Sequence, residues 1–194
     1  MPIRTGRYVL TLPSGPVITG SAAVVGKKEG EGPLGQEFDH IFTDTTMGES
    51  SWEKAESALV REAIIRALAK ASLSSAEIDV IFSGDLLNQC IATTFGLREL
   101  DIPFAGLYGA CSTMALSLAM AAVFADSGAA NNAIASTSSH FASAEKQFRY
   151  PLEYGGQRPP SAQWTATAAG AGVVRKSGGR PPSGQGLVGR IPCL

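Results

Sequence analysis

The segment from Ile102 to Gly128, IPFAGLYGACSTMALSLAMAAVFADSG, decides how this chain folds. A short apolar run leads into small residues around Cys111, and Met114 to Ala125 is apolar at every position except Ser117. The pattern predicts a buried strand, a tight turn and then a helix without a polar face. We therefore expect this helix to be buried at the centre of the fold, with sheet or helix on both sides.

The position of Cys111 between the predicted strand and helix suits a reactive thiol. The unpaired N–H groups of a helix N-terminus carry partial positive charge, which favours the thiolate. Small residues on either side allow a substrate to approach the sulfur closely. Cys111 is therefore a candidate nucleophile for acyl transfer. The alternative is a core cysteine that packs among small side chains, because free cysteine is among the most buried residue types.

Bulk composition limits the class of protein. At 194 residues, with 44% hydrophobic residues, the chain is long enough for one domain with its own core. A net charge of −1 and 17% charged residues give no basic surface for nucleic acid and no acidic tail. The 3 cysteines, Cys90, Cys111 and Cys193, and only 2 histidines predict neither a disulfide scaffold nor a zinc site, and favour a reducing compartment.

The sequence also bears on location. Its first residues lack the apolar core of a signal peptide, and no apolar run reaches the ~18 residues expected of a membrane span. We therefore expect a cytoplasmic protein without a transmembrane segment, whose membrane association is peripheral or through partners.

Strand and helix patterns alternate along the chain. We expect strands near residues 16–25, 80–83, 103–108, 132–136, 164–175 and 187–191. The capping-box pattern Ser50-x-x-Glu53 opens a predicted helix over 52–71, and further helices are expected over 87–100 and after Cys111. This alternation is typical of an α/β fold with a mixed, mostly parallel sheet flanked by helices.

Three residues are candidates for the functional site. Functional groups of an open α/β sheet lie just past the carboxyl ends of its strands, and Asp85, Cys111 and His140 all follow predicted strands. A cysteine with a histidine can form a nucleophile and its base. For Asp85 the alternative is a helix N-cap, and for His140 it is a hydrogen-bonded structural histidine. Cys90 lies within a predicted helix and is expected in the core.

Several motifs occur in an order that resembles a known family. Gly109-Ala110-Cys111-Ser112 and the order of elements are similar to the N-terminal half of the thiolase-like superfamily, which includes 3-oxoacyl-(acyl-carrier-protein) synthase III. The closer resemblance is to the stage V sporulation protein AD family of endospore-forming bacteria. It rests on KEGEGPLG at 28–35, SGDLLNQ at 83–89, LYGACST at 107–113, TSSH at 137–140 and QFRYPLEYGGQ at 147–157.

This resemblance implies a sporulation protein that binds dipicolinic acid (pyridine-2,6-dicarboxylate). It also implies that the protein acts together with other stage V sporulation membrane proteins. These partners would move the ligand, as a calcium complex, into the developing spore. The thiolase-type pocket would then serve binding rather than catalysis, with Asp85, Cys111 and His140 as ligand-binding candidates. No cofactor or protein-bound metal is expected, and calcium would arrive only with the ligand. The expected location is peripheral, at the forespore inner membrane.

The chain departs from the superfamily pattern in its length. Thiolase-like proteins consist of two similar halves, and the second half supplies the catalytic histidine. This chain ends at Leu194, so we expect a single N-terminal thiolase-like domain over 1–194, with the second half absent through truncation, a frameshift or fragmentation. An uncovered apolar face favours a homo-oligomer. The alternative function is an acyltransferase of the 3-oxoacyl-(acyl-carrier-protein) synthase III type, with Cys111 as the acyl-accepting nucleophile.

Overall fold

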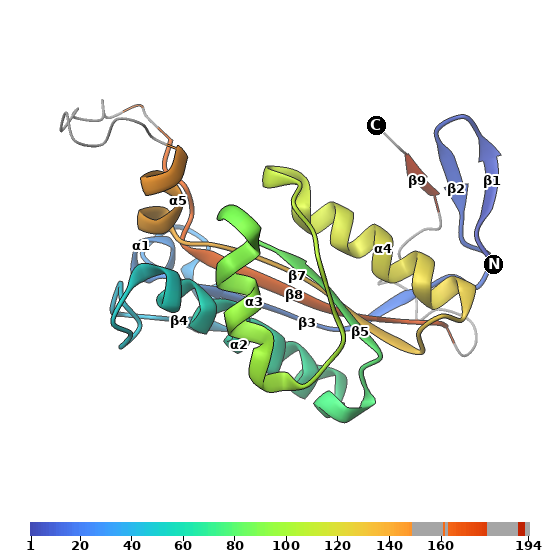
Figure 1. The fold of residues 1–194 in the computed structure, drawn as a ribbon, viewed down its shortest axis with the longest axis horizontal. Coiled ribbons are helices and arrows are strands. Elements are labelled where there is room, and N and C mark those ends of the chain that lie inside the picture. Colours follow the sequence, from blue (N-terminus) through green and yellow to red (C-terminus); the bar gives the residue numbers. More distant parts are fainter. Residues whose placement is uncertain (149–160, 162, 178–189, 193–194) are drawn as a thin grey trace.

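A six-stranded sheet forms the centre of the computed structural model, which describes residues 1–148, 161, 163–177 and 190–192 (Figure 1). Its strand order is β4 (His40–Ile41), β3 (Val17–Val25), β8 (Ala168–Arg175), β7 (Asn132–Ser139), β5 (Val80–Gly84) and β6 (Phe104–Gly106). Three neighbouring pairs are parallel, whereas β8 runs antiparallel to both β3 and β7. The predicted mixed, mostly parallel sheet is therefore confirmed.

Helices cover both faces of this sheet. On one face α2 (Trp52–Ala71) packs on β3, β7 and β8, and α3 (Ile91–Leu97) packs on α2. On the other face α4 (Thr113–Ser127) packs on β5, β7 and β8, as Figure 1 shows. The remaining elements are α1 (Lys27–Gly30), α5 (Phe141–Phe148), short 3-10 turns, and a small sheet of β1 (Ile3–Gly6), β2 (Val9–Thr11) and β9 (Arg190–Pro192).

The sequence of α2 explains its place in the fold. Ser51, rather than the predicted Ser50, is the N-cap, because its backbone is extended and its hydroxyl accepts a hydrogen bond from the Lys54 N–H. Ser72 ends the helix in the left-handed conformation. The predicted apolar stripe faces the sheet, and its buried residues are Ala55, Leu59, Val60, Ala63, Ile64, Ala67 and Leu68.

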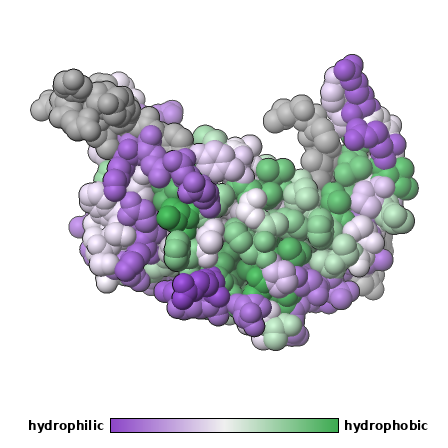
Figure 2. Space-filling model, viewed as in Figure 1, coloured by the Kyte–Doolittle hydropathy of each residue, from purple (hydrophilic) through white to green (hydrophobic). Residues whose placement is uncertain are grey.

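The prediction that the helix after Cys111 is covered on both sides is wrong for the described chain. One face of α4 is buried, but Leu116 on the outer face is 39% exposed. The sheet can cover only one side of the helix, and Figure 2 shows hydrophobic residues gathered at the surface in this region. The window Ala110–Ser127 also has the length and hydropathy of a membrane-crossing helix, contrary to expectation, although one such helix is weak support for a span.

Other segments differ from their predicted structure. The helix predicted over 87–100 is interrupted because Gln89 and Cys90 have positive φ angles, which leaves a shorter α3. β8 begins at Ala168 rather than at residue 164. Residues 187–189 of the last predicted strand lie outside the described residues, and β9 pairs with β2 in the small sheet. The sequence patterns did not predict the β1–β2 hairpin or α5.

Candidate functional site

Cys111 lies in a 3-10 turn, Ala110–Ser112, between β6 and α4. The Thr113 hydroxyl fixes this turn, since it donates to the Ala110 carbonyl at 2.8 Å and accepts from the Gly109 N–H at 3.2 Å. Ala110 has a φ of 47°, a left-handed conformation that is rare for a residue with a side chain. The order of β6, this turn and α4 confirms the predicted strand, turn and helix. Because Cys111 is exposed, the core-cysteine alternative is wrong. Cys90 is buried, as predicted.

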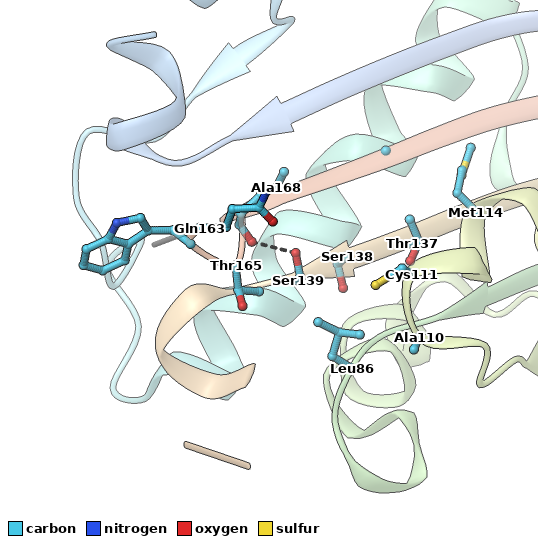
Figure 3. Close-up of a pocket in the computed structure, with 13 residues that line it drawn as sticks. Leu86, Ala110, Cys111, Met114, Thr137, Ser138, Ser139, Gln163, Thr165 and Ala168 are labelled. Atoms are coloured by element: carbon cyan, nitrogen blue, oxygen red, sulfur yellow. Dashed lines mark hydrogen bonds between the residues drawn. The ribbon is translucent and has the colours of Figure 1, made fainter. Parts of the chain in front are cut away.

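A cavity of about 520 Å³, here called the Cys111 cavity, opens beside this turn (Figure 3). It lies at the carboxyl ends of β5 and β7, where β7 continues beyond its last pair with β5. Its wall consists of Leu86, Ala110, Cys111, Met114, Thr137, Ser138, Ser139, Gln163, Trp164, Thr165, Ala166, Ala168 and Gly170. The volume falls within the roughly 300–1,000 Å³ typical of small-molecule sites.

The described wall of the Cys111 cavity is mostly apolar, with several hydroxyl groups, and carries no charged side chain. Its hydroxyls donate their protons to acceptors of the protein. Ser139 donates to the Ala166 carbonyl at 2.6 Å, Thr137 to the Gly84 carbonyl at 3.0 Å, and Thr165 to a Glu145 carboxylate oxygen at 3.2 Å. These oxygens therefore retain lone pairs and can accept hydrogen bonds or bind a cation.

Residues 163–167, which form one side of the wall, are held by the motif at 28–35. The Lys28 ammonium lies 3.4 Å from the centroid of the Trp164 ring, and a Glu29 carboxylate oxygen accepts from the Thr167 N–H at 3.0 Å. On the opposite side, the Asn88 N–H donates to Gln147 at 3.0 Å. The motif at 28–35 thus supports the cavity from outside its lining, whereas the motif at 83–89 contributes Leu86 to the wall.

Asp85 does not line the Cys111 cavity, although its neighbour Leu86 does. Its buried carboxylate accepts from the Leu87 N–H at 2.8 Å and from the Thr93 N–H and hydroxyl at 2.7 and 2.6 Å. Thr93 lies in the first turn of α3, so Asp85 binds that turn, but Cys90 and not Asp85 occupies the N-cap position, and the predicted N-cap alternative is wrong. A Cβ atom on Gly84 would overlap the Leu107 carbonyl oxygen, so the turn into Asp85 requires glycine. Ligand binding by Asp85 stays a prediction.

His140 is buried and lines a second, smaller cavity of about 220 Å³ rather than the Cys111 cavity. Its Nε2 bonds the Thr45 carbonyl at 2.8 Å and its Nδ1 accepts from the Ala142 N–H at 3.2 Å, so the ring is neutral with the proton on Nε2. Burial lowers the pKa of His140, which agrees with this neutral ring. The alternative of a hydrogen-bonded structural histidine is confirmed, while a role in ligand binding stays a prediction.

Glu56 is a buried acid that the sequence analysis missed. It belongs to α2 and is 0% exposed, and it accepts hydrogen bonds from the Ser138 hydroxyl at 3.1 Å and the Ser143 hydroxyl at 2.7 Å. Burial raises the pKa of Glu56 to about 7, and the nearby charge of Asp85 acts in the same direction. Its position beside Ala55 and one turn before Leu59, on the apolar stripe of the helix, was the signal that could have identified it.

Potential metal ligands do not gather in the part of the chain that the structure describes. Within residues 1–148, 161, 163–177 and 190–192, no group of three histidine, cysteine, aspartate or glutamate residues is placed to hold a metal ion. The described wall of the Cys111 cavity instead carries neutral hydroxyl groups.

Solved structures share this fold. The 3-oxoacyl-[acyl-carrier-protein] synthase III from Aquifex aeolicus VF5 has a TM-score of 0.58 and 18% identity, with 85% of this chain and 55% of that chain covered. A fungal type III polyketide synthase has a TM-score of 0.59 and 15% identity, with 87% and 57% covered. At these identities the similarity establishes a thiolase-like fold and nothing about activity.

Sequence comparison identifies the family. A family model for stage V sporulation protein AD matches residues 6–192. The stage V sporulation protein AD of Bacillus subtilis (strain 168) is 42% identical over 180 residues, which cover 92% of this chain and 53% of that protein. The chain therefore spans about half the length of this relative. It is a sporulation protein with a thiolase-like fold and belongs to the stage V sporulation protein AD family.

Proposed function

We propose that this chain binds dipicolinic acid, as its calcium complex, in the Cys111 cavity, and serves in the uptake of that ligand into the developing spore. The observation that carries the proposal is a cavity of about 520 Å³ beside an exposed Cys111 in a member of this sporulation family. In this proposal the thiolase-like fold serves binding rather than catalysis.

The chemistry of the wall favours the calcium complex over free dipicolinate. The free ligand carries two carboxylates, but no lysine, arginine or histidine belongs to the part of the wall that the structure describes. The wall hydroxyls of Thr137, Ser139 and Thr165 already donate to the protein, so they offer lone pairs rather than protons. Calcium prefers oxygen ligands, and in the complex it also balances the ligand's negative charge. A neutral chelate therefore suits this cavity better than a dianion.

Acyl transfer remains the alternative, because Cys111 is exposed at the cavity and precedes the N-terminus of α4. A thiol nucleophile needs a base within hydrogen-bonding reach. In the described wall no side chain can serve as that base, and the His140 ring is bonded to Thr45 and Ala142. Binding without turnover is therefore the better-supported function of this chain.

The proposal includes partners and a location. As a peripheral protein at the forespore inner membrane, the chain would act with other stage V sporulation membrane proteins, which carry the ligand across. A pull-down from sporulating cells, with the wild-type chain as bait and the cavity-filling variant described below as a comparison, tests this association.

Isothermal titration calorimetry tests the binding proposal directly. The chain is titrated with calcium dipicolinate, with dipicolinate in the presence of a chelator, and with calcium alone. We expect the calcium complex to bind at least about tenfold more tightly than free dipicolinate, a difference of about 1.4 kcal/mol. Equal affinities would contradict the argument from the wall's charge, and no binding of either form would defeat the proposal. Labelling of Cys111 by acyl-coenzyme A in a parallel sample would instead favour acyl transfer.

Gly170 offers a matched pair of variants for this titration. It lines the cavity, and a Cβ atom added to it would meet no atom within 4 Å. Gly170→Leu should fill the cavity and weaken binding at least about tenfold, whereas Gly170→Ala should change it little. Circular dichroism checks that both variants fold. Unchanged binding by Gly170→Leu would place the ligand elsewhere, for instance in the second cavity beside His140.

A further inference from the structure

Glu56 lies one residue behind the wall of the Cys111 cavity. Its Oε1 accepts from the Ser138 hydroxyl, and Ser138 is a wall residue that lies between Ser139 and Cys111 in Figure 3. Its Oε2 accepts from the Ser143 hydroxyl of α5. The nearby His140 backbone favours the ionised form of this carboxyl and so opposes the rise of its pKa. A fully buried carboxylate thus connects α2, the end of β7 and α5.

This network can satisfy Glu56 in both of its protonation states. Serine hydroxyls can donate or accept, so the Ser138 hydroxyl can accept from a protonated Glu56 and turn its own proton away. The Ser143 hydroxyl has a second acceptor already in place, the His140 carbonyl at 3.0 Å. Proton uptake by Glu56 therefore leaves the Ser143 hydroxyl paired and frees the Ser138 hydroxyl to donate to a group in the Cys111 cavity.

The charged groups around Glu56 make its neutral form accessible. Asp85, at the end of β5, is the acidic neighbour whose charge opposes ionisation of Glu56. The His140 ring is neutral, and the helix α3 and strands β3 and β7 carry no titratable side chain. On α5, Lys146 pairs with Glu53 at 3.3 Å, one turn before Glu56 on α2. β8 contributes only Arg175, which is exposed at its far end. No described cation therefore pairs with Glu56.

These observations indicate that an anion in the Cys111 cavity is disfavoured while Glu56 is ionised. Among the described wall residues there is no cation, and the Ser138 hydroxyl donates to a buried carboxylate just behind the wall. We infer that binding of an anionic group in the Cys111 cavity is coupled to proton uptake by Glu56, with Ser138 as the connecting residue. This inference rests on the proposed function, because it names the control of that same cavity, and it makes Glu56 a positioning residue.

The direction of the coupling follows from linkage. Glu56 titrates near neutral pH because burial raises its pKa to about 7. An anion that favours protonated Glu56 raises this pKa further, so protons are taken up on binding and anion affinity falls as pH rises between the two pKa values. A further rise of about one pKa unit corresponds to about a tenfold loss of affinity across that interval.

Alkylation of Cys111 measures this coupling without any assumption about the natural ligand. Iodoacetate is an anion and iodoacetamide is neutral, and with both reagents the thiolate sulfur forms a bond to carbon while iodide leaves. Because both reactions need the thiolate, the ratio of the two rates cancels the thiolate fraction and reports how well the cavity admits negative charge. Mass spectrometry of the Cys111 peptide separates it from the other cysteines.

We expect the iodoacetate-to-iodoacetamide rate ratio at Cys111 to fall about three- to tenfold from about pH 6 to about pH 9 in the wild-type chain. In Glu56→Gln the ratio should stay near its low-pH value throughout, since the amide has the shape and the neutrality of the protonated acid. The matched control Glu62→Gln removes an acid of the same helix that pairs with Arg66 at the surface, and it should keep the wild-type pH profile.

Ser138→Ala keeps the test valid if Glu56→Gln does not fold. Loss of the Ser138 hydroxyl removes one donor from the ionised carboxylate, so the fall in the rate ratio should move to higher pH. A wild-type ratio independent of pH, or an unchanged profile in Glu56→Gln, would overturn the inference.

Calorimetry with free dipicolinate in two buffers of different ionisation enthalpy separates the inference from the proposed function. We expect uptake of about half a proton per ligand near neutral pH in the wild-type chain and none in Glu56→Gln. If neither free dipicolinate nor its calcium complex binds while the alkylation ratio still depends on Glu56, the proposed function fails and the coupling stands. If dipicolinate binds without proton uptake by the wild-type chain, the function stands and the coupling is overturned.

Discussion

Helices α2 and α4 cover opposite faces of the same sheet but are built differently. α2 has one apolar stripe, and its outer face carries ion pairs such as Arg66 with Glu62 at 2.6 Å. α4 has apolar residues on nearly all sides, and Leu116 faces away from the sheet. A helix with a charged outer face is complete after packing on one sheet, whereas an apolar helix calls for a second covering layer.

This difference matters for the site because the two helices supply its two parts. Cys111 immediately precedes α4, whose outer face is partly in solvent, whereas Glu56 belongs to α2, whose inner face is fully buried. The thiol is thus presented at the less covered side of the sheet, and the buried acid is held at the better packed side. The following experiments test this contrast.

The largest effect is expected in the buried stripe of α2. Leu59 is 0% exposed and belongs to the main core cluster, so Leu59→Ala should lower the free energy of unfolding by about 2–5 kcal/mol. The control is Ile65→Ala on the same helix, since Ile65 is 46% exposed and should cost less than about 1 kcal/mol. Urea denaturation followed by circular dichroism gives both values. Similar losses in the two variants would remove the distinction between the two faces of α2.

The next effect concerns the acid that α2 buries. The pKa of Glu56 is about 7 in the folded chain and lies near its ordinary value of 4.5 after unfolding. Between these values the folded state holds more protons, so stability falls as pH rises, by on the order of 3 kcal/mol in total. Above the folded-state pKa this loss is complete.

Glu56→Gln should abolish that part of the pH dependence. The variant should match the wild-type stability at the acidic end of the interval and exceed it above neutral pH, whereas Glu62→Gln should follow the wild-type profile. Chemical denaturation at a series of pH values measures the difference. A wild-type stability that increases from acidic to neutral pH, with the same slope in Glu56→Gln, would mean that Glu56 is ionised in the fold throughout.

The same contrast shows how much of the fold was predictable from sequence. In α2 the apolar residues recur at 3–4 spacing, and this local pattern is enough to predict a helix with one buried face. The structure places that helix at its predicted bounds. For α4 the apolar pattern predicts a helix correctly, but its covering depends on distant segments, which local periodicity does not encode. The division of the helix predicted over 87–100 follows from the backbone of Gln89 and Cys90, neither of which is a typical left-handed residue.

Prediction of the site was limited for a related reason. Sequence alone places Asp85, Cys111 and His140 after strands, but it does not determine which way each side chain faces. The structure puts Cys111 on the cavity wall, pairs Asp85 with Thr93 in the first turn of α3, and buries His140 beside another cavity. Glu56 lies far from these residues in the sequence and reaches the site only through Ser138 on β7.

A smaller effect is expected in the reactivity of the two described cysteines, one on each side of the sheet. Cys111 is exposed before α4, whereas Cys90 is the N-cap residue of α3 and its thiol donates to the Leu107 carbonyl at 3.4 Å. Burial raises the pKa of the Cys90 thiol, so its reactive thiolate is scarce at neutral pH. Iodoacetamide should label Cys111 at least about tenfold faster than Cys90, as read from modified peptides by mass spectrometry. Equal rates would indicate that the turn around Cys111 is closed in solution.

The smallest effect is expected on the outer face of α4. Leu116 is partly in water, so Leu116→Gln should change the free energy of unfolding by no more than about 0.5 kcal/mol. Ala121 lies on the inner face of the same helix and is 0% exposed, so Ala121→Gln, the control, should overpack the sheet, bury an amide and cost more than about 2 kcal/mol. Denaturation of both variants at two protein concentrations measures the contrast. If Leu116→Gln is strongly destabilising and its effect grows with protein concentration, a second copy covers α4 in solution. The outer face of α4 would then be buried, and the contrast with the solvent-facing side of α2 would be larger in sequence than in covering.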